Sequence, residues 1–281
     1  MIFDYLGEYY KSQEQKIREN FLLAVSTFDV EGIHELRVEI KRLRAFFHLI
    51  GHINPVFRPE QDLQKIQSLF KSAGKIRDIH VQQNMAREKI SSLNLELSEY
   101  LNFLKEKEMR ARKQFSKAGK KFDFGILKKT WTRMRNVLIY ISGEYIQYKS
   151  EERFKSLIDE LFTFKSHLDF SEKDYHAIRI LSKETRYTLE ILQKCFPDKS
   201  SLQDVNDSLR SMHQALGKWH DYDLGLLFLN NFEKDFGDLI YFDKESYTKY
   251  AQNLLEEKTI KLEEFEKKWF VFLDVIQENE C

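Results

Sequence analysis

The chain has 281 residues, and its 45 Lys plus Arg balance 45 Asp plus Glu, so the formal net charge at pH 7 is zero. This balance argues against a protein that coats nucleic acid, because such domains are usually basic as a whole. Two cysteines cannot form a disulfide framework, no apolar run approaches the ~18 residues of a membrane span, and the first residues do not resemble a signal peptide. We therefore expect a reduced protein of the cytoplasm whose anion sites, if any, come from local segregation of charge.

The composition favours long helices, since only three Pro and ten Gly interrupt a chain that is 42% hydrophobic. Apolar periodicity and closely spaced Glu/Lys pairs predict helices over residues 3–27, 60–92, 95–119, 124–145, 150–168, 201–234 and 244–278, in addition to two helices described below. No linker rich in Gly, Ser or Pro divides the chain. We expect an all-α fold with a single domain over 1–281, built from two helical bundles related by a pseudo-twofold axis. The repeats would cover about 1–145 and 146–281, with a break near 142–152.

The helix that follows residue 29 carries four basic side chains at spacings of three, four and three residues. These residues, called here the first basic ladder, are His34, Arg37, Lys41 and Arg44. At 100° per residue they share about 80° of one helix face. The apolar residues of this helix, from Ile33 to Ile50, lie on the adjacent face, so the cations should lie at the edge of the buried side. Asp29 or Glu31 supplies the predicted start of the helix and Gly51–Pro55 its end.

The same ladder occurs again 142 residues later. The second basic ladder consists of His176, Arg179, Lys183 and Arg186, and Pro197 follows it as Pro55 follows the first. A glycine segment comes next in both halves: Gly74-Lys75-Ile76-Arg77-Asp78 and, at an offset of 143, Gly217-Lys218-Trp219-His220-Asp221. Three landmarks in register indicate an internal duplication.

Four cations on one stripe repel each other unless an anion lies along them. At roughly 6 Å and an effective dielectric constant near 20, each neighbouring pair costs about 3 kcal/mol. Arginine can direct two N–H groups at phosphate oxygens, and lysine supplies a compact charge. Two such ladders are therefore a candidate cradle for an extended polyanion. The competing interpretation is a solvated basic face paired with Glu35, Glu39 or Glu184.

These segments resemble one family, the CHAD (conserved histidine α-helical domain) family. The resemblance rests on residues 33–44 and 175–187 and on the two glycine segments, and it spans nearly the whole chain. It implies a helical fold with internal twofold pseudosymmetry and no cofactor. It also implies that basic residues lining a central surface or pore bind inorganic polyphosphate or another phosphorylated polyanion, which would place the protein in the cytoplasm and at polyphosphate granules.

Carried over position by position, the resemblance predicts anion contacts from both ladders and from basic residues around them. The predicted contacts are His34, Arg37, Lys41, Arg42, Arg44, Arg77, His176, Arg179, Lys183, Arg186, Lys218 and His220. His220 stands where the family usually has the arginine that Arg77 supplies, and Arg42 has Glu184 as its counterpart. We therefore expect an asymmetric site that is stronger on the N-terminal side, with binding that tightens from about pH 8 to 6 as the histidines become charged.

Other functions find less support in the sequence. His48 and His52 have a spacing that suits a metal, but no third ligand is evident. The string Glu106-Lys107-Glu108-Met109-Arg110 does not match the Glu-x-Glu-x-Lys of triphosphate-tunnel enzymes, and no Walker or nucleophile-elbow motif occurs. We therefore expect a binding module that is not an enzyme and does not bind membranes. The alternatives are a helical adaptor for nucleic acid or for an acidic protein, and, more weakly, a phosphohydrolase.

Overall fold

The computed structural model describes residues 2–166, 170–196, 202–236 and 243–278, and every regular element in these ranges is helical. In chain order the helices are α1 (Ile2–Thr27), α2 (Val30–Ile53), α3 (Pro59–Leu93), α4 (Ser98–Lys121), α5 (Gly125–Leu138), α6 (Gly143–Phe162), the short 3-10 helix η1 (Thr163–Ser166), α7 (Glu172–Cys195), α8 (Gln203–Phe236) and α9 (Lys244–Glu278). The predicted all-α fold class is confirmed.

The two ladder helices begin at well-defined caps. The Asp29 carboxylate accepts a hydrogen bond from the Gly32 backbone N–H at 2.6 Å, which starts α2 as predicted. Ser171 and Asp174 form a capping box at the start of α7. Each helix has 24 residues, and α2 ends at Ile53, just before Pro55. The equivalent Pro197 lies outside the described residues.

The predicted break near 142–152 is wrong. Helix α5 ends at Leu138, so the predicted helix over 124–145 stops early, and α6 already begins at Gly143. The cause is local, because the Ser142 hydroxyl caps α6 by accepting a hydrogen bond from the Tyr145 backbone N–H at 3.2 Å. The predicted helix over 150–168 therefore starts earlier than expected, and its last residues, 167 and 168, lie outside the described residues.

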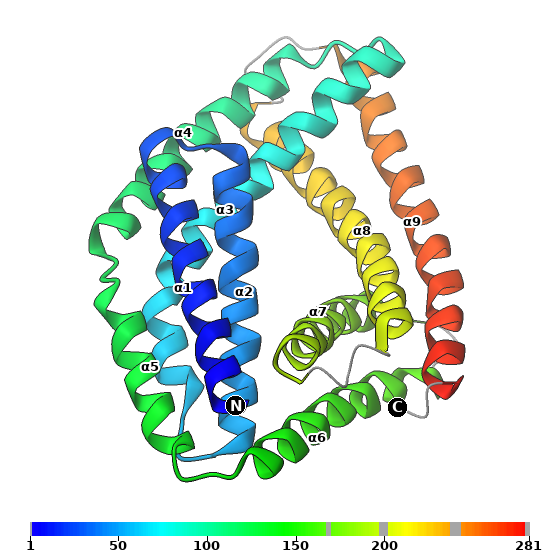
Figure 1. Ribbon diagram of the computed structural model, residues 1–281. Coiled ribbons are helices and arrows are strands. Elements are labelled where there is room, and N and C mark those ends of the chain that lie inside the picture. Colours follow the sequence, from blue (N-terminus) through cyan, green and yellow to red (C-terminus); the bar gives the residue numbers. More distant parts are fainter. Residues whose placement is uncertain (1, 167–169, 197–201, 237–242, 279–281) are drawn as a thin grey trace.

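The helices bring the two halves of the chain together around α2 and α7. Figure 1 shows α1 and α2 side by side and α8 and α9 as a second pair, with α7 between these pairs and α6 crossing the lower edge. Helix α2 packs against α7, and α3 packs against α8. One cluster of buried apolar residues extends from α1 to α9. The ladder helices thus lie at the junction of the halves.

Large side chains fill this core. Tyr10 stacks on Trp131 with 5.1 Å between ring centroids, and its hydroxyl donates to the Leu127 carbonyl oxygen at 2.7 Å. In the other half, Phe232 stacks on Tyr247 at 5.3 Å. Within the described ranges, no helix combines the length and apolar character that crossing a bilayer would require.

Candidate functional site

The middle residues of the two basic ladders approach each other across the contact between α2 and α7. The Lys41 ammonium lies within electrostatic range of both Arg37, on its own helix, and Arg179, on α7. Lys183 in turn lies near Lys41, Arg179 and Arg37. The two ladders therefore face a shared region at Arg37, Lys41, Arg179 and Lys183 and do not lie on opposite exteriors.

Helices α3 and α8 complete this region. Helix α3 contributes Arg77 and Asp78, and α8 contributes His213 and Asp221. We call the full set the central cluster: Arg37, Lys41, Arg77, Asp78, Arg179, Lys183, His213 and Asp221. The Asp78 carboxylate interacts electrostatically with Arg37, Lys41 and Arg77 of its own half and with Arg179 of the other half. The cluster therefore spans both halves.

Burial and mutual repulsion remove protons from the two lysines of the cluster. The pKa of Lys41 falls to about 7, first because the amine is buried and then because Arg37 and Arg179 lie near it. The pKa of Lys183 falls to about 6, again chiefly through burial and then through Lys41 and Arg179. At pH 7 the cluster therefore holds amines that an anion could recharge.

Two carboxylates face five Lys or Arg side chains in this set. Burial raises the pKa of Asp78 and of Asp221, although neighbouring arginines and lysines oppose the rise. Neither carboxylate forms an ion pair within 4.0 Å with a cluster cation among the described residues. The cluster consequently keeps an excess of positive potential that its own side chains do not neutralise.

Arg37 is held firmly in the first half. Its Nη1 donates a hydrogen bond to the Phe70 carbonyl oxygen at 3.0 Å, and the guanidinium lies 4.6 Å from the centroid of the Phe70 ring. Its terminal nitrogens also occupy the space over Gly74, where a Cβ atom would collide with Nη1. Gly74 is therefore required for the close approach of Arg37 to α3.

Arg179 and His213 in the second half are less engaged. The Arg179 Nε and the His213 Nε2 are buried and have no hydrogen-bond partner among the described residues. The pKa of His213 falls to about 2 because the ring is buried and because Lys183, Arg186, Lys41 and Arg179 surround it. Buried polar atoms normally have partners, so these two unsatisfied groups mark a place where a ligand can contribute.

Two predicted contact residues are engaged elsewhere. Arg42 donates to Glu39 at 2.5 Å and to Glu190 at 3.1 Å, and Arg186 donates to the other oxygen of Glu190 at 2.8 Å. Arg42 and Arg186 thus share a carboxylate that links α2 with α7. Both residues belong to an ion-paired network and are not free cations, because Glu39 and Glu190 turn toward them.

This pairing removes one of the two reasons for a stronger N-terminal side. That expectation depended on Arg77 facing a histidine counterpart, His220, and on Arg42, and the charge of Arg42 is matched by Glu39 and Glu190. Its counterpart Glu184 pairs with Arg153 at 2.7 Å and with His48 at 3.2 Å, so Glu184 does not face the ladder cations as an opposing charge. The asymmetry exists, but the unsatisfied donors lie in the second half.

The remaining predicted residues lie around the central cluster. His34 lies near Arg77, Lys41 and Arg37, while His176 and His220 lie near Arg179, with 6.0 Å between their ring centroids. Burial first, and then these cations, lower the pKa of all three histidines, that of His220 to about 4. In the free protein these rings are therefore neutral at pH 7, and the two lysines titrate between pH 6 and 8 in their place.

Lys218 and Arg44 mark the borders of this region. Lys218 is exposed and lies near Asp221. Arg44 is exposed, and it lines a hollow between α2 and α3 with His48 and Glu60.

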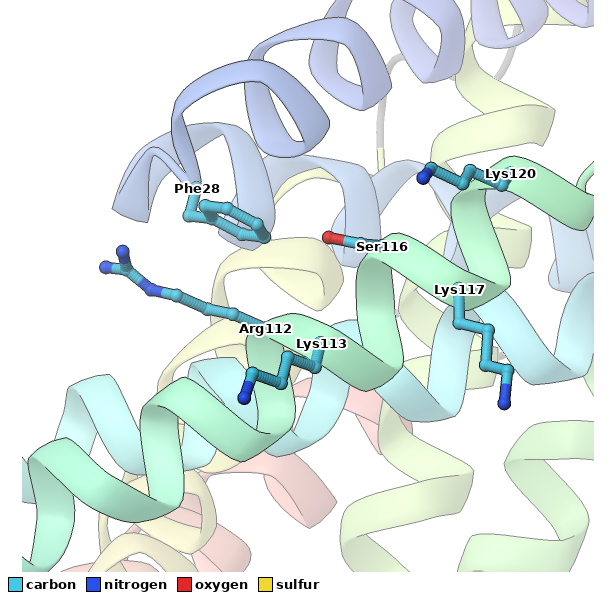
Figure 2. Close-up of a pocket in the computed structure, with 6 residues that line it drawn as sticks. All are labelled: Phe28, Arg112, Lys113, Ser116, Lys117 and Lys120. Carbon is cyan, nitrogen blue, oxygen red and sulfur yellow. The ribbon is translucent and has the colours of Figure 1, made fainter.

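A separate basic hollow lies between the end of α1 and α4. Figure 2 shows the six residues that line it, with Phe28 and Arg112 side by side and with Lys113, Ser116, Lys117 and Lys120 on successive turns of α4. The Arg112 guanidinium lies 5.0 Å from the centroid of the Phe28 ring and pairs with Glu108. No ladder residue lines this hollow, so it serves below as a control surface.

The residues considered for a metal have other partners. His48 contacts Glu184 at 3.2 Å, and His52 contacts Glu152 at 2.9 Å. Among the described residues, no group of three His, Cys, Asp or Glu side chains has the arrangement that would hold a metal ion.

His213 is the cluster residue that sequence reasoning missed. It lies outside both ladders and four residues before Gly217, one helical turn away. That spacing is the signal that would have revealed it. One turn before Gly74, the equivalent position is Phe70, which contacts Arg37.

Comparisons with known proteins agree with this architecture. The model of the CHAD domain family matches residues 8–230. The crystal structure of the CHAD domain from the plant Ricinus communis has a TM-score of 0.67 at 18% identity and covers 96% of this chain and 92% of that chain. PptA from Streptomyces chartreusis has a TM-score of 0.62 at 16% identity, with 98% and 99% covered. A search of curated proteins finds no match.

Proposed function

Because the chain belongs to the CHAD domain family, we propose that it binds inorganic polyphosphate in the central cluster and does not catalyse a reaction there. The observation that carries the proposal is the set of basic side chains from α2, α3 and α7, which outnumber the two carboxylates of the cluster, Asp78 and Asp221. A phosphate chain would relieve the repulsion that lowers the pKa values of Lys41 and Lys183. The protein would act in the cytoplasm, at polyphosphate granules, by holding or shielding the polymer.

Polyphosphate suits this cluster better than nucleic acid does. Lys41, Arg37 and Arg179 are each partly or largely buried, so a ligand must bring negative charge into a confined region. Polyphosphate is a slim chain with about one charge per phosphate, whereas a duplex presents its phosphates on a wide cylinder. The zero net charge of the protein also gives no general attraction for nucleic acid.

A thermal-shift titration tests the proposal. Long-chain polyphosphate at 100 times its dissociation constant should stabilise the wild-type protein by about 2.7 kcal/mol. The double variant Arg37→Glu, Arg179→Glu should lower the affinity at least about a hundredfold, because two charge-assisted contacts are replaced by repulsion. Circular dichroism without ligand should show unchanged helical content.

The matched control is Lys113→Glu with Lys117→Glu, which makes the same change in net charge on α4. This control should keep the affinity within about threefold of wild type. If both double variants lose binding equally, the attraction depends on overall charge and the proposal fails. If duplex DNA or RNA displaces polyphosphate at equal phosphate concentration, the adaptor function is favoured, and release of phosphate in the presence of a divalent metal would indicate a phosphohydrolase.

A further inference from the structure

The two halves differ at one pair of positions beside the ladder helices. The offset of 143 residues that matches Gly74 with Gly217 also matches Phe70 with His213. Phe70 holds Arg37 through its ring and its carbonyl oxygen. His213 lies near Arg179, the counterpart of Arg37, but it gives Arg179 no hydrogen bond within the described part of the chain.

Gly74 and Gly217 also differ, and again the first half is more tightly filled than the second. A Cβ atom on Gly74 would collide with the guanidinium of Arg37, whereas a Cβ atom on Gly217 would meet no heavy atom within 4 Å. Arg179 therefore does not occupy the space over Gly217 as Arg37 occupies the space over Gly74. Gly217 corresponds to Gly74, whose own space is occupied by a residue of the first ladder, and α8 packs against α7, so we place the open space on the side of the second ladder.

Unsatisfied donors accompany the open space. The buried Arg179 Nε and His213 Nε2 have no partner among the described residues, and Lys183 lies within electrostatic range of both side chains. The first half offers a ligand fewer unpaired donors, because the Arg37 Nη1 already donates a hydrogen bond to the Phe70 carbonyl oxygen. The charged non-bridging oxygens of a phosphate in the polymer accept hydrogen bonds from such donors, and these bonds are strongest when the acceptor is charged.

We infer that the second half of the central cluster contains the tight phosphate subsite, formed by Arg179, Lys183 and His213 beside Gly217, while Arg37 serves as a fixed cation for the rest of the chain. The inference rests on the proposed polyphosphate binding and names the residues that would hold one phosphoryl group of the polymer most closely.

The chemistry of His213 suits this role. Burial first, and then Lys41 on α2 and Arg179, Lys183 and Arg186 on α7, keep the ring neutral, with a pKa of about 2 in the free protein. A neutral imidazole still has one N–H group, which it can place on Nε2 to donate to a phosphate oxygen. A bound phosphate also reverses the local field, which favours protonation of the ring and strengthens the contact.

Calorimetric titration with tripolyphosphate tests the subsite, because this short ligand occupies few positions. The variant His213→Phe, which copies the first-half residue, should weaken tripolyphosphate binding about tenfold. The variant His213→Gln, which keeps a neutral donor near the position of Nε2, should recover most of the affinity. His48→Phe makes the same change outside the cluster and should leave the affinity within about threefold of wild type.

A second variant fills the open space. Gly217→Leu should weaken tripolyphosphate binding at least about tenfold, because its side chain fills the space over Gly217, and a melting curve without ligand checks that the variant folds. If His213→Phe and Gly217→Leu both fold and bind tripolyphosphate as the wild type does, the subsite is overturned while long-chain binding survives. If wild-type protein binds neither tripolyphosphate nor long-chain polyphosphate, the proposed function and the subsite fail together.

Discussion

Arg42 shows how a basic residue beside a ligand site can have a structural task. Its guanidinium connects Glu39, which is 2% exposed, with Glu190, and Glu190 also holds Arg186 on α7. The side chain of Arg42 thus compensates a buried charge within α2 and joins the two ladder helices. A sequence pattern of basic residues cannot distinguish this structural role of Arg42 from ligand binding. The carboxylate that pairs with Arg42 across the two helices belongs to Glu190, which lies 148 residues away along the chain.

The structural task of Arg42 predicts a change in stability without a change in affinity. Arg42→Ala should lower the free energy of unfolding by about 2–3 kcal/mol, near the lower end for a broken buried pair because Arg42 is partly exposed. Urea denaturation measures this loss. Adding Glu39→Gln should restore part of the stability, since the uncompensated charge is then gone. A large loss of polyphosphate affinity in folded Arg42→Ala would show that Arg42 is a ligand contact after all.

The two glycines of the repeated segments predict opposite responses to alanine. Gly217→Ala should raise the free energy of unfolding by about 0.5–1 kcal/mol, because alanine favours the helix and its Cβ meets no atom. Gly74→Ala should lack this gain, because the guanidinium of Arg37 must move and its bond to the Phe70 carbonyl oxygen, with a net value of about 1 kcal/mol, is disturbed. Denaturant titrations of the two variants measure the difference, and equal stabilities would contradict it.

At the level of single elements, the sequence contains most of the helical fold. Helix α2 follows from the apolar spacing between Ile33 and Ile50, from the Asp29 cap and from Pro55. The sequence predicts the α5–α6 boundary too late, because the stretch from Tyr140 to Tyr148 is compatible with helix or strand. The Ser142 cap, a single hydroxyl, decides where α6 begins.

The site was less predictable than the helices. Spacing alone indicates that Arg37, Lys41 and Arg44 share a face of α2, but which of them reaches the other ladder depends on how α2 packs against α7. Packing places Lys41 near Arg179 and leaves Arg44 exposed beside α3. His213 comes from α8 and belongs to no ladder, so tertiary contact alone brings it to the cluster.

The contact between α2 and α7 also predicts that ligand binding takes up protons. Lys41 and Lys183 have pKa values of about 7 and 6 in the free protein, and a bound polyanion should raise both. Affinity should therefore rise as pH falls from 8 to 6, with the lysines as the titrating groups. Calorimetry at pH 7.5 in buffers with different ionisation enthalpies measures the protons taken up.

The variant Lys183→Arg distinguishes the positive charge at position 183 from proton uptake at that position. Arginine stays charged at these pH values, so the variant should still bind polyphosphate but take up fewer protons and show a flatter pH dependence. Lys113→Arg on α4 is the matched control and should behave as the wild type. An unchanged proton uptake in Lys183→Arg would exclude Lys183 as a titrating group.

For the molecule as a whole, the central cluster makes the stability of the free protein depend on pH. The unfolded chain holds a proton on each lysine up to about pH 10.4, whereas folding lowers the pKa values of Lys41 and Lys183 to about 7 and 6. Between pH 7 and 9 the unfolded state therefore binds more protons, and stability increases with pH. The cluster thus works against folding when its lysines are charged, which a bound polyanion would reverse.

Melting curves followed by circular dichroism test this reversal. Without ligand, the melting temperature should rise from pH 7 to 9 by at least about 2–4 °C, the shift that 1 kcal/mol gives in a domain of this size. With saturating polyphosphate the rise should vanish or change sign, because the bound protein keeps both lysines charged. Lys183→Met should reduce the rise in the free protein, whereas Lys113→Met, on the exposed face of α4, should not. A free protein whose melting temperature falls over this range would mean that the two ladders do not confine Lys41 and Lys183 together.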